Sequence, residues 1–362
     1  MPISKIENSS IEDTAIHGAR NLIINGNFAI AQRGTSSTSS GHGSVDRYRV
    51  DFLNFDQLGV TQSQSTTVPS GKGFSNSLKV AVTTQETTLD ANELFIIRQT
   101  IEAQNLQHLA YGTSSAKSLT LSFWVRSSLA GKYSVMFFSE DGNRSNTPSF
   151  TISSADTWEF VTIRIDGDTA GTINNDNGKG LQVTWVLAAG TDWTGTPHTG
   201  WGSFNQSDDY AFSDQVNFAA QTGEFYITGV QLEVGSATPF EHEPFAETLQ
   251  KCQRYFTRIP RIDGSSAYTQ IGNGMGTQTN KFLGVIHFPT EMRANPTMVA
   301  SGSFRIFNGG TLNPTAGPVV SSSSTFGGGV QVNTGAGIST KDGLLITLNN
   351  DIDANLQFSA EL

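Results

Sequence analysis

The chain has 362 residues, of which 15% are charged and 36% hydrophobic, and it contains 37 glycines and 23 phenylalanines. This composition excludes a disordered, highly charged chain, and the frequent aromatic residues favour β-strands. The formal net charge is −10 and the lysines and arginines are scattered, so no basic stripe exists to bind phosphates and nucleic acid is not an expected partner.

The first twenty residues differ from the rest of the chain. Isoleucine recurs every five residues, at Ile6, Ile11 and Ile16, which matches neither the helical period of 3.6 nor the strand period of two. Such spacing suits an extended docking arm over residues 1–20 that becomes ordered only on a partner. A disordered leader with chance spacing is the alternative. The arm has no secretion-signal pattern and the chain has no run of 18 apolar residues, so membrane insertion is not expected.

From Asn21 onward the chain reads as short strands separated by Gly, Ser, Asn and Asp. Within 118–127, apolar residues alternate with Thr120, Ser122, Trp124 and Arg126, which predicts a half-buried strand. The expected elements are strands at 21–25, 46–52, 77–82, 94–101, 118–127, 132–140, 159–166, 181–189 and 223–235, and one helix at 102–110. Many strands without a βαβ rhythm predict an all-β fold whose main domain, 21–241, is an antiparallel jelly-roll β-sandwich.

A second, smaller β domain follows. Pro239 and Pro244 in GSATPFEHEPF, 235–245, indicate a linker, and we place the boundary between the domains at 242–257, which includes a short helix at 246–256. The C-terminal β domain is expected at 258–362, with mobile Gly/Ser-rich loops such as SSSSTFGGG. Its expected strands are 281–288, 297–301, 304–308, 329–333, 344–349 and 356–362.

The residues with reactive side chains form no known catalytic motif. The six histidines are far apart in the sequence, and the single cysteine, Cys252, lies in an apolar helical pattern that favours packing over nucleophilic chemistry. Asp208, Asp209 and Asp214 could include a glycosidase pair, although solvated surface carboxylates are the simpler interpretation. We therefore expect a protein without enzymatic activity, with a glycan depolymerase as the alternative.

Two acidic stretches contain potential metal ligands. The segment DGDTAGTINNDN, 166–177, begins like a calcium-binding loop, but Ala170 and Asn177 occupy two ligand positions. We expect a hairpin loop there. In FEHEPF, Glu241 and Glu243 flank His242, and adjacent residues of this kind are more typical of a polar linker than of one metal site.

An aromatic-rich segment, 192–210, follows the strongly apolar strand at 181–189. It contains Trp193, Trp201 and Tyr210 among Gly, Asn and Asp. Aromatic faces beside polar acceptors can stack on sugar rings while the sugar hydroxyls form hydrogen bonds. These three residues are therefore candidate glycan contacts. Packing of the loop against the sandwich or a neighbouring subunit is the alternative.

Several passages, in the same order, resemble bacteriophage virion and tail-fibre proteins. They are NLIINGNFAIAQRG, SVDRYRVDF, IIRQTIEAQNLQHLAYG, YITGVQLEVGSATPFEHEPFAETLQKCQRYF, HFPTEMRANPT and FSAEL. The sandwich of this family is similar to that of carbohydrate-binding modules. Some of these modules hold a structural calcium ion at positions that match Asn27 and Glu233, although Ala29 stands where an acid often follows. No other cofactor is expected.

The resemblance implies a tail-fibre or fibre-adaptor subunit, located in the virion and assembled in the cytoplasm of the host bacterium. Its expected partners are sister chains in a homotrimer, other phage tail or capsid proteins, and host surface polysaccharide. A capsid decoration or head-fibre protein with the same fold is the alternative within this class.

Overall fold

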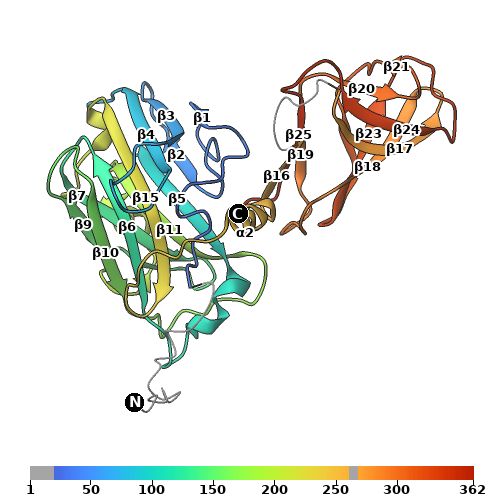
Figure 1. Ribbon diagram of the computed structural model, residues 1–362. Coiled ribbons are helices and arrows are strands. Elements are labelled where there is room, and N and C mark those ends of the chain that lie inside the picture. The colour runs from blue at the N-terminus through green and yellow to red at the C-terminus, as the bar shows by residue number, and fades with distance from the viewer. Residues whose placement is uncertain (1–19, 261–267) are drawn as a thin grey trace, which may run out of the picture. The chain divides into compact units, whose positions relative to one another are not determined.

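The computed structural model describes residues 20–260 and 268–362 (Figure 1). The docking-arm residues Ile6, Ile11 and Ile16 lie outside this part of the chain. The all-β fold is confirmed, because the described chain consists mainly of antiparallel strands with a few short helices. It divides into two compact units, the first ending at Pro244 and the second spanning Phe245–Glu361.

The first unit is a sandwich of two antiparallel sheets (Figure 1). Sheet A contains, in spatial order, β1 (Ser36–Ser37), β3 (Gly59–Ser65), β4 (Ser77–Thr84), β15 (Gly223–Val234), β6 (Leu119–Ser127) and β10 (Glu159–Ile165). Sheet B contains β13 (Gly202–Ser203), β8 (Arg144–Asn146), β7 (Gly131–Ser139), β11 (Lys179–Ala189), β5 (Leu94–Glu102) and β2 (Arg49–Leu53), with β9 (Ser149–Ile152) paired to β7. The connections include the 3₁₀ helices η2 (Ala103–Leu109) and η3 (Phe218–Ala220), the helix α1 (Gln206–Asp209), and the parallel pair β12 (Thr194–Gly195) and β14 (Ala211–Phe212).

The core lies between the two sheets and follows from the alternation of side chains along each strand. In β6 the four alternating apolar residues of the predicted pattern are fully buried in the core, whereas Trp124 is only partly buried on the other face. Trp185 of β11 faces Phe123 across the sandwich, with ring centroids 5.7 Å apart in an edge-to-face arrangement. The period-two pattern thus identified the inner face correctly.

The segment 21–27 corrects one expectation, because it forms bends and turns instead of the predicted first strand. It runs beside β15, where the Leu22 N–H donates to the Leu232 carbonyl and the Val230 N–H to the Gly26 carbonyl. Asn25 has a left-handed backbone, with φ of 62°, which breaks the regular pairing a strand requires. The apolar run is nevertheless partly in the core, since Ile23 is buried.

The loop 166–177 also differs from expectation. It joins β10 at the edge of sheet A to β11 inside sheet B, so it crosses between the sheets and is not a hairpin loop.

The predicted helix at 102–110 exists as the 3₁₀ helix η2, whose Leu106 and Leu109 are buried. This helix ends at Ala110, which adopts a left-handed backbone.

The second unit begins with α2 (Phe245–Gln253), which carries the buried Cys252. A three-stranded sheet contains β16 (Phe256–Ile259), β25 (Asn355–Ser359) and β19 (Thr297–Ser301). A seven-stranded sheet contains β21 (Thr311–Leu312), β20 (Phe304–Phe307), β24 (Gly343–Leu348), β17 (Gln270–Gln278), β18 (Lys281–His287), β23 (Gly327–Asn333) and β22 (Val319–Ser323). The Ser/Gly-rich stretch expected to be a mobile loop thus belongs to the β22–β23 hairpin.

Candidate functional site

The three predicted glycan contacts separate in the structure. Trp193 and Tyr210 lie together, with ring centroids 5.1 Å apart, against a small apolar cluster that includes Ile96 and Val186 of sheet B. Trp201 packs instead against the main core of the sandwich. Only Trp193 and Tyr210 therefore belong to the surface described next, and Trp201 belongs to a different part of the molecule.

Sheet B turns one face to the core and one face outward. Val50, Ile97 and Val183 are core residues, so their neighbours along β2, β5 and β11 point to the outer face. That face carries charged and amide side chains contributed by four strands or strand ends: Arg49 and Asp51 of β2, Arg98 of β5, Gln182 of β11, and Glu140 directly after β7. We call these five residues the polar row.

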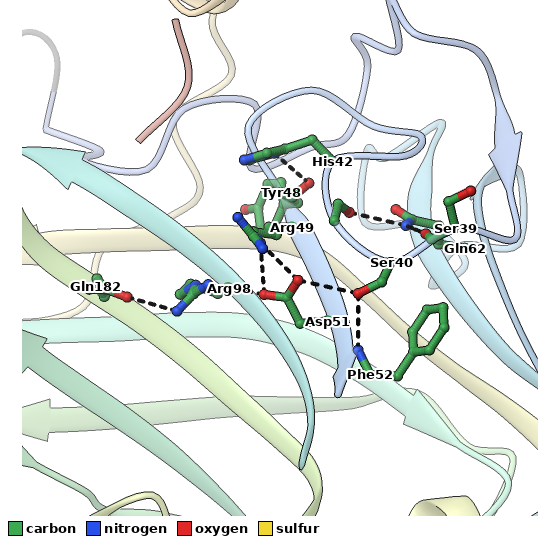
Figure 2. Close-up of polar contacts among 11 residues, drawn as sticks. Ser39, Ser40, His42, Tyr48, Arg49, Asp51, Phe52, Gln62, Arg98 and Gln182 are labelled. Atoms are coloured by element: carbon green, nitrogen blue, oxygen red, sulfur yellow. Dashed lines mark hydrogen bonds and ion pairs between the residues drawn. The ribbon is translucent and has the colours of Figure 1, made fainter. Parts of the chain in front are cut away.

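Hydrogen bonds make the polar row continuous, and Figure 2 shows four of its members, Arg49, Asp51, Arg98 and Gln182. Arg49 Nε lies 2.8 Å from both carboxylate oxygens of Asp51, and Arg98 Nη2 donates to Asp51 Oδ2 at 3.0 Å. Arg98 Nη1 donates to Gln182 Oε1 at 3.2 Å, and Gln182 Nε2 donates to Glu140 Oε2 at 2.6 Å. Donors and acceptors thus alternate along the row.

Burial differs along the row. The side chains of Asp51 and Gln182 are almost completely buried, whereas that of Arg98 is 24% exposed and that of Arg49 is 41% exposed. Two guanidinium groups compensate the buried carboxylate of Asp51, because an unpaired buried charge would be strongly unfavourable. The same contacts hold the two arginines in fixed positions, with part of each side chain open to solvent.

Aromatic rings form a second line on this face. Ring centroids are 4.7 Å apart for Phe138 and Phe204, 5.9 Å for Phe204 and Tyr210, and 5.1 Å for Tyr210 and Trp193. All four residues are partly exposed. Phe138 is the register partner of Gln182 in the β7–β11 ladder, so the aromatic line begins beside the polar row. We call these four residues the aromatic line.

Tyr210 of the aromatic line lies on the same face of sheet B as the polar row. Burial raises the pKa of its hydroxyl; the charge of Arg98 opposes this shift, and those of Glu140 and Asp51 add to it. Tyr210 packs against a cluster that includes Ile96 and Val186, which lie on the same strands as Arg98 and Gln182. The outer face of sheet B therefore combines fixed hydrogen-bonding groups with adjacent aromatic rings, an arrangement that suits a polyhydroxylated ligand.

The carboxylates considered for hydrolysis have structural contacts. Asp209 is buried and accepts hydrogen bonds from Ser145 Oγ at 2.9 Å and from the Asn205 N–H at 2.6 Å. Asp208 accepts from Asn205 Nδ2. Asp214 pairs with Lys132 Nζ at 2.7 Å, and this contact lowers the pKa of Asp214. A lowered pKa opposes a role for Asp214 as a general acid.

The positions matching a calcium site are also engaged locally. Glu233 accepts hydrogen bonds from Gln231 Nε2 at 2.8 Å and from both the N–H and the hydroxyl of Thr238, at 2.8 Å and 2.6 Å. Asn27 Oδ1 caps the Ala29 N–H at 3.4 Å. Across residues 20–260 and 268–362, no group of three or more His, Cys, Asp or Glu side chains is placed to hold a metal ion.

The sequence indicates Trp193 and Tyr210, which lie on the outer face of sheet B, but it does not indicate the polar row. Arg49, Arg98 and Gln182 are far apart in the sequence and meet only through strand register, in which Arg98 pairs with both Arg49 and Thr184. The available signal was a charged or amide residue interrupting each of three largely apolar strands.

None of the helices in the described part of the chain is long and apolar enough to cross a membrane.

No family model matches the chain, and a search of curated proteins found no match by sequence. Among solved structures, it is similar to the enzymatically active domain of bacteriophage CBA120 tailspike protein 4, with 14% identity and a TM-score of 0.33, over 60% of this chain and 22% of that one. A putative sugar-binding protein from Bacteroides thetaiotaomicron has 15% identity and a TM-score of 0.34, over 59% of this chain and 100% of that one. A family 11 carbohydrate-binding module of a Clostridium thermocellum cellulase has 13% identity and a TM-score of 0.29, over 58% of this chain and 98% of that one.

Proposed function

We propose that the chain is a non-enzymatic subunit of a bacteriophage virion appendage, a tail fibre or fibre adaptor, and that its sandwich binds host surface glycans through the outer face of sheet B. The observation that carries the glycan part is the polar row beside the aromatic line. The virion part rests on the sequence resemblance, whose segments keep the same order from Asn21 to the C-terminal residues.

The chemistry of the outer face fits a neutral or weakly charged polysaccharide. Sugar hydroxyls can donate to Glu140 and accept from the exposed parts of Arg49 and Arg98, while the C–H faces of the sugar rings pack on aromatic side chains. Because Asp51 already fixes the arginines, little side-chain freedom would be lost when a glycan binds.

The glycan part is tested with a matched pair of arginine variants. Arg98→Met removes one donor of the polar row, and Asp51 keeps both contacts to Arg49. Arg126→Met is the control, because Arg126 is 25% exposed and also forms one ion pair, with Asp156, but extends from sheet A. We expect Arg98→Met to weaken binding to immobilised bacterial surface polysaccharides at least about tenfold and Arg126→Met to leave it unchanged.

A wild-type chain that binds none of a broad panel of bacterial polysaccharides would overturn the glycan part. If the Arg98→Met and Arg126→Met variants bind polysaccharide equally well, the glycan-binding site does not lie on the outer face of sheet B. The non-enzymatic part is tested separately, by incubating the chain with a polysaccharide that it binds and measuring new reducing ends. We expect none, and saturable release of reducing ends would favour a depolymerase.

The proposal includes assembly in the host cytoplasm and attachment to other virion proteins through residues 1–20. Deletion of these residues should abolish incorporation into particles while the sandwich stays folded, and normal incorporation would contradict the docking role. We also propose a homotrimer. Sedimentation equilibrium should then give about three times the chain mass of 38.8 kDa.

A further inference from the structure

A cleft of about 420 Å³ lies at one edge of the sandwich. Its walls come from β8, from the end of β10 with the loop that follows, and from Thr199–Trp201. Ser145 of β8 pairs with Phe138 and so belongs to the outer face of sheet B, whereas Arg144 and Asn146 alternate to the opposite side and line the cleft. The cleft is therefore separate from the polar row.

Trp201 is the aromatic wall of the cleft, and its position is fixed by three contacts. Its Nε1 donates to the Asp166 carbonyl at 2.7 Å, and its ring meets Tyr111 edge to face with centroids 5.6 Å apart. Its backbone carbonyl accepts from Arg144 Nη2 at 2.9 Å. A partly exposed ring held in this way offers apolar surface to a ligand without losing side-chain freedom on binding.

The charges that line the cleft balance. Arg144 Nε pairs with the buried Asp168 at 2.7 Å, and the exposed Arg164 and Asp166 contribute one further charge of each sign. A cleft without net charge provides no net electrostatic attraction for a charged ligand. Its guanidinium and carboxylate groups nevertheless supply strong hydrogen-bond donors and acceptors. This combination favours an uncharged ligand with many hydroxyl groups.

Buried polar groups near the cleft lack partners. Asn146 is 2% exposed, and its Oδ1 has no hydrogen-bond partner among the described residues. The hydroxyl of Tyr111, whose ring packs edge to face on Trp201, has no partner among the described residues either. Unsatisfied buried polar atoms are costly and are often found where a ligand or water completes the hydrogen bonding.

From these observations we infer that the cleft beside Trp201 is a second ligand site, which binds one uncharged sugar unit at the edge of the sandwich. The apolar face of the sugar stacks on Trp201. Its hydroxyls exchange hydrogen bonds with Arg164 and Asp166, and one hydroxyl reaches the Asn146 amide. The cleft volume lies toward the lower end of the range typical of small-molecule sites, as expected for a short ligand.

The test uses the full chain and a panel of free sugars followed by saturation-transfer NMR and calorimetry. The panel contains neutral hexoses and N-acetylhexosamines, with glucuronate and N-acetylneuraminate as acidic members. The blocking variant is Gly200→Met. Gly200 lines the cleft, and a Cβ built on it meets no atom within 4 Å, so the added side chain enters open space without disturbing the fold. Gly335→Met, at another glycine with open space around it, is the matched control.

We expect saturable binding of at least one neutral sugar, weakened about tenfold or more by both Gly200→Met and Trp201→Ala. Gly335→Met and Arg98→Met should leave it unchanged. Binding of only the acidic sugars, no binding of any sugar, or full binding by Gly200→Met would each overturn the inference. Since Arg98→Met acts on the outer face of sheet B and Gly200→Met on the cleft, failure of one site is distinguishable from failure of the other.

Discussion

Asn25 provides a direct test of what the segment NLIINGNFAIAQRG does. Its buried side chain makes three hydrogen bonds: Nδ2 donates to the carbonyls of Ile30 and Asp46 at 2.9 Å and 3.0 Å, and Oδ1 accepts from the Ile30 N–H at 3.0 Å. Asp46 in turn accepts from the backbone of Gln32 at 2.8 Å. We call Asn25, Ile30, Gln32 and Asp46 the Asn25 cluster.

The expected cost of removing Asn25 follows from these contacts. Each hydrogen bond contributes about 1 kcal/mol net, so Asn25→Gly should lower the free energy of unfolding by about 3 kcal/mol. Asn25→Ala should lower it by about 1 kcal/mol more, because Asn25 has φ of 62°, a conformation that glycine adopts freely and alanine does not. Asn54→Ala is the control: Asn54 has φ of 65° but is exposed and makes one side-chain hydrogen bond, so we expect a loss of only about 1–2 kcal/mol.

The assay is urea unfolding followed by tryptophan fluorescence. All five tryptophans precede Pro244, so the signal reports the sandwich and not the second unit. The free energies of unfolding of Asn25→Gly and Asn25→Ala could instead both lie within about 1 kcal/mol of the wild-type value. Such a loss is smaller than the contribution expected from the three hydrogen bonds. The structural interpretation of the segment would then be refuted.

Three further changes test other parts of the sandwich with the same assay. Gly26→Ala places a Cβ against the Val230 carbonyl oxygen, a rigid backbone atom, so we expect a loss of about 2 kcal/mol or more, and an unchanged midpoint would contradict the pairing with β15. Arg144→Met leaves the carboxylate of Asp168 buried without its guanidinium partner, at a cost of about 3 kcal/mol; Arg164→Met, which removes an exposed arginine, should cost less than about 1 kcal/mol. Burial raises the pKa of Tyr133 to about 12. The stability that this pKa difference between folded and unfolded states provides is complete below about pH 10, where the phenol of the unfolded chain begins to ionise. It is lost as the pH rises through 12. Tyr133→Phe should therefore show a shallower loss of stability between these pH values, and parallel curves would contradict the shift.

Prediction from sequence succeeded where a strand buries one face. In β6, alternating apolar residues identified both the strand and its inner face. It failed for β3 and β17, whose sequences GVTQSQS and QIGNGMGTQ contain few apolar residues. β17 forms because its glycines allow close approach to β18, where Gly274 pairs with Gly284. Pairing of this kind is set by tertiary register and leaves no hydrophobic period in the strand itself.

The candidate site was predictable only in part, because tertiary packing decides on which surface each aromatic residue lies. The aromatic loop carries Trp193, Trp201 and Tyr210 in one short segment, so composition alone indicated it. Composition could not divide the segment between two surfaces. That division depends on Trp201 packing against the core, while Trp193 and Tyr210 pack over sheet B.

The residues that carry the family resemblance overlap only in part with those that would carry ligand binding. Arg49, Asp51 and Arg98 of the polar row lie within the resembling segments, whereas Gln182 and Glu140 lie outside them. In the first resembling segments, Asn25 and Gln32 belong to the Asn25 cluster, and Phe28 packs on Tyr48 with ring centroids 4.5 Å apart in the core. Neither the aromatic line nor Trp201 falls within any of the resembling segments. Selection for folding alone would retain Asn25, Gln32 and Phe28, because the two amides are buried and hydrogen-bonded and Phe28 is part of the core. Proteins that share these segments are therefore expected to share the sandwich and the Arg49–Asp51–Arg98 part of the polar row. If the proposed glycan binding holds, differences in specificity should arise from the aromatic line and from Trp201.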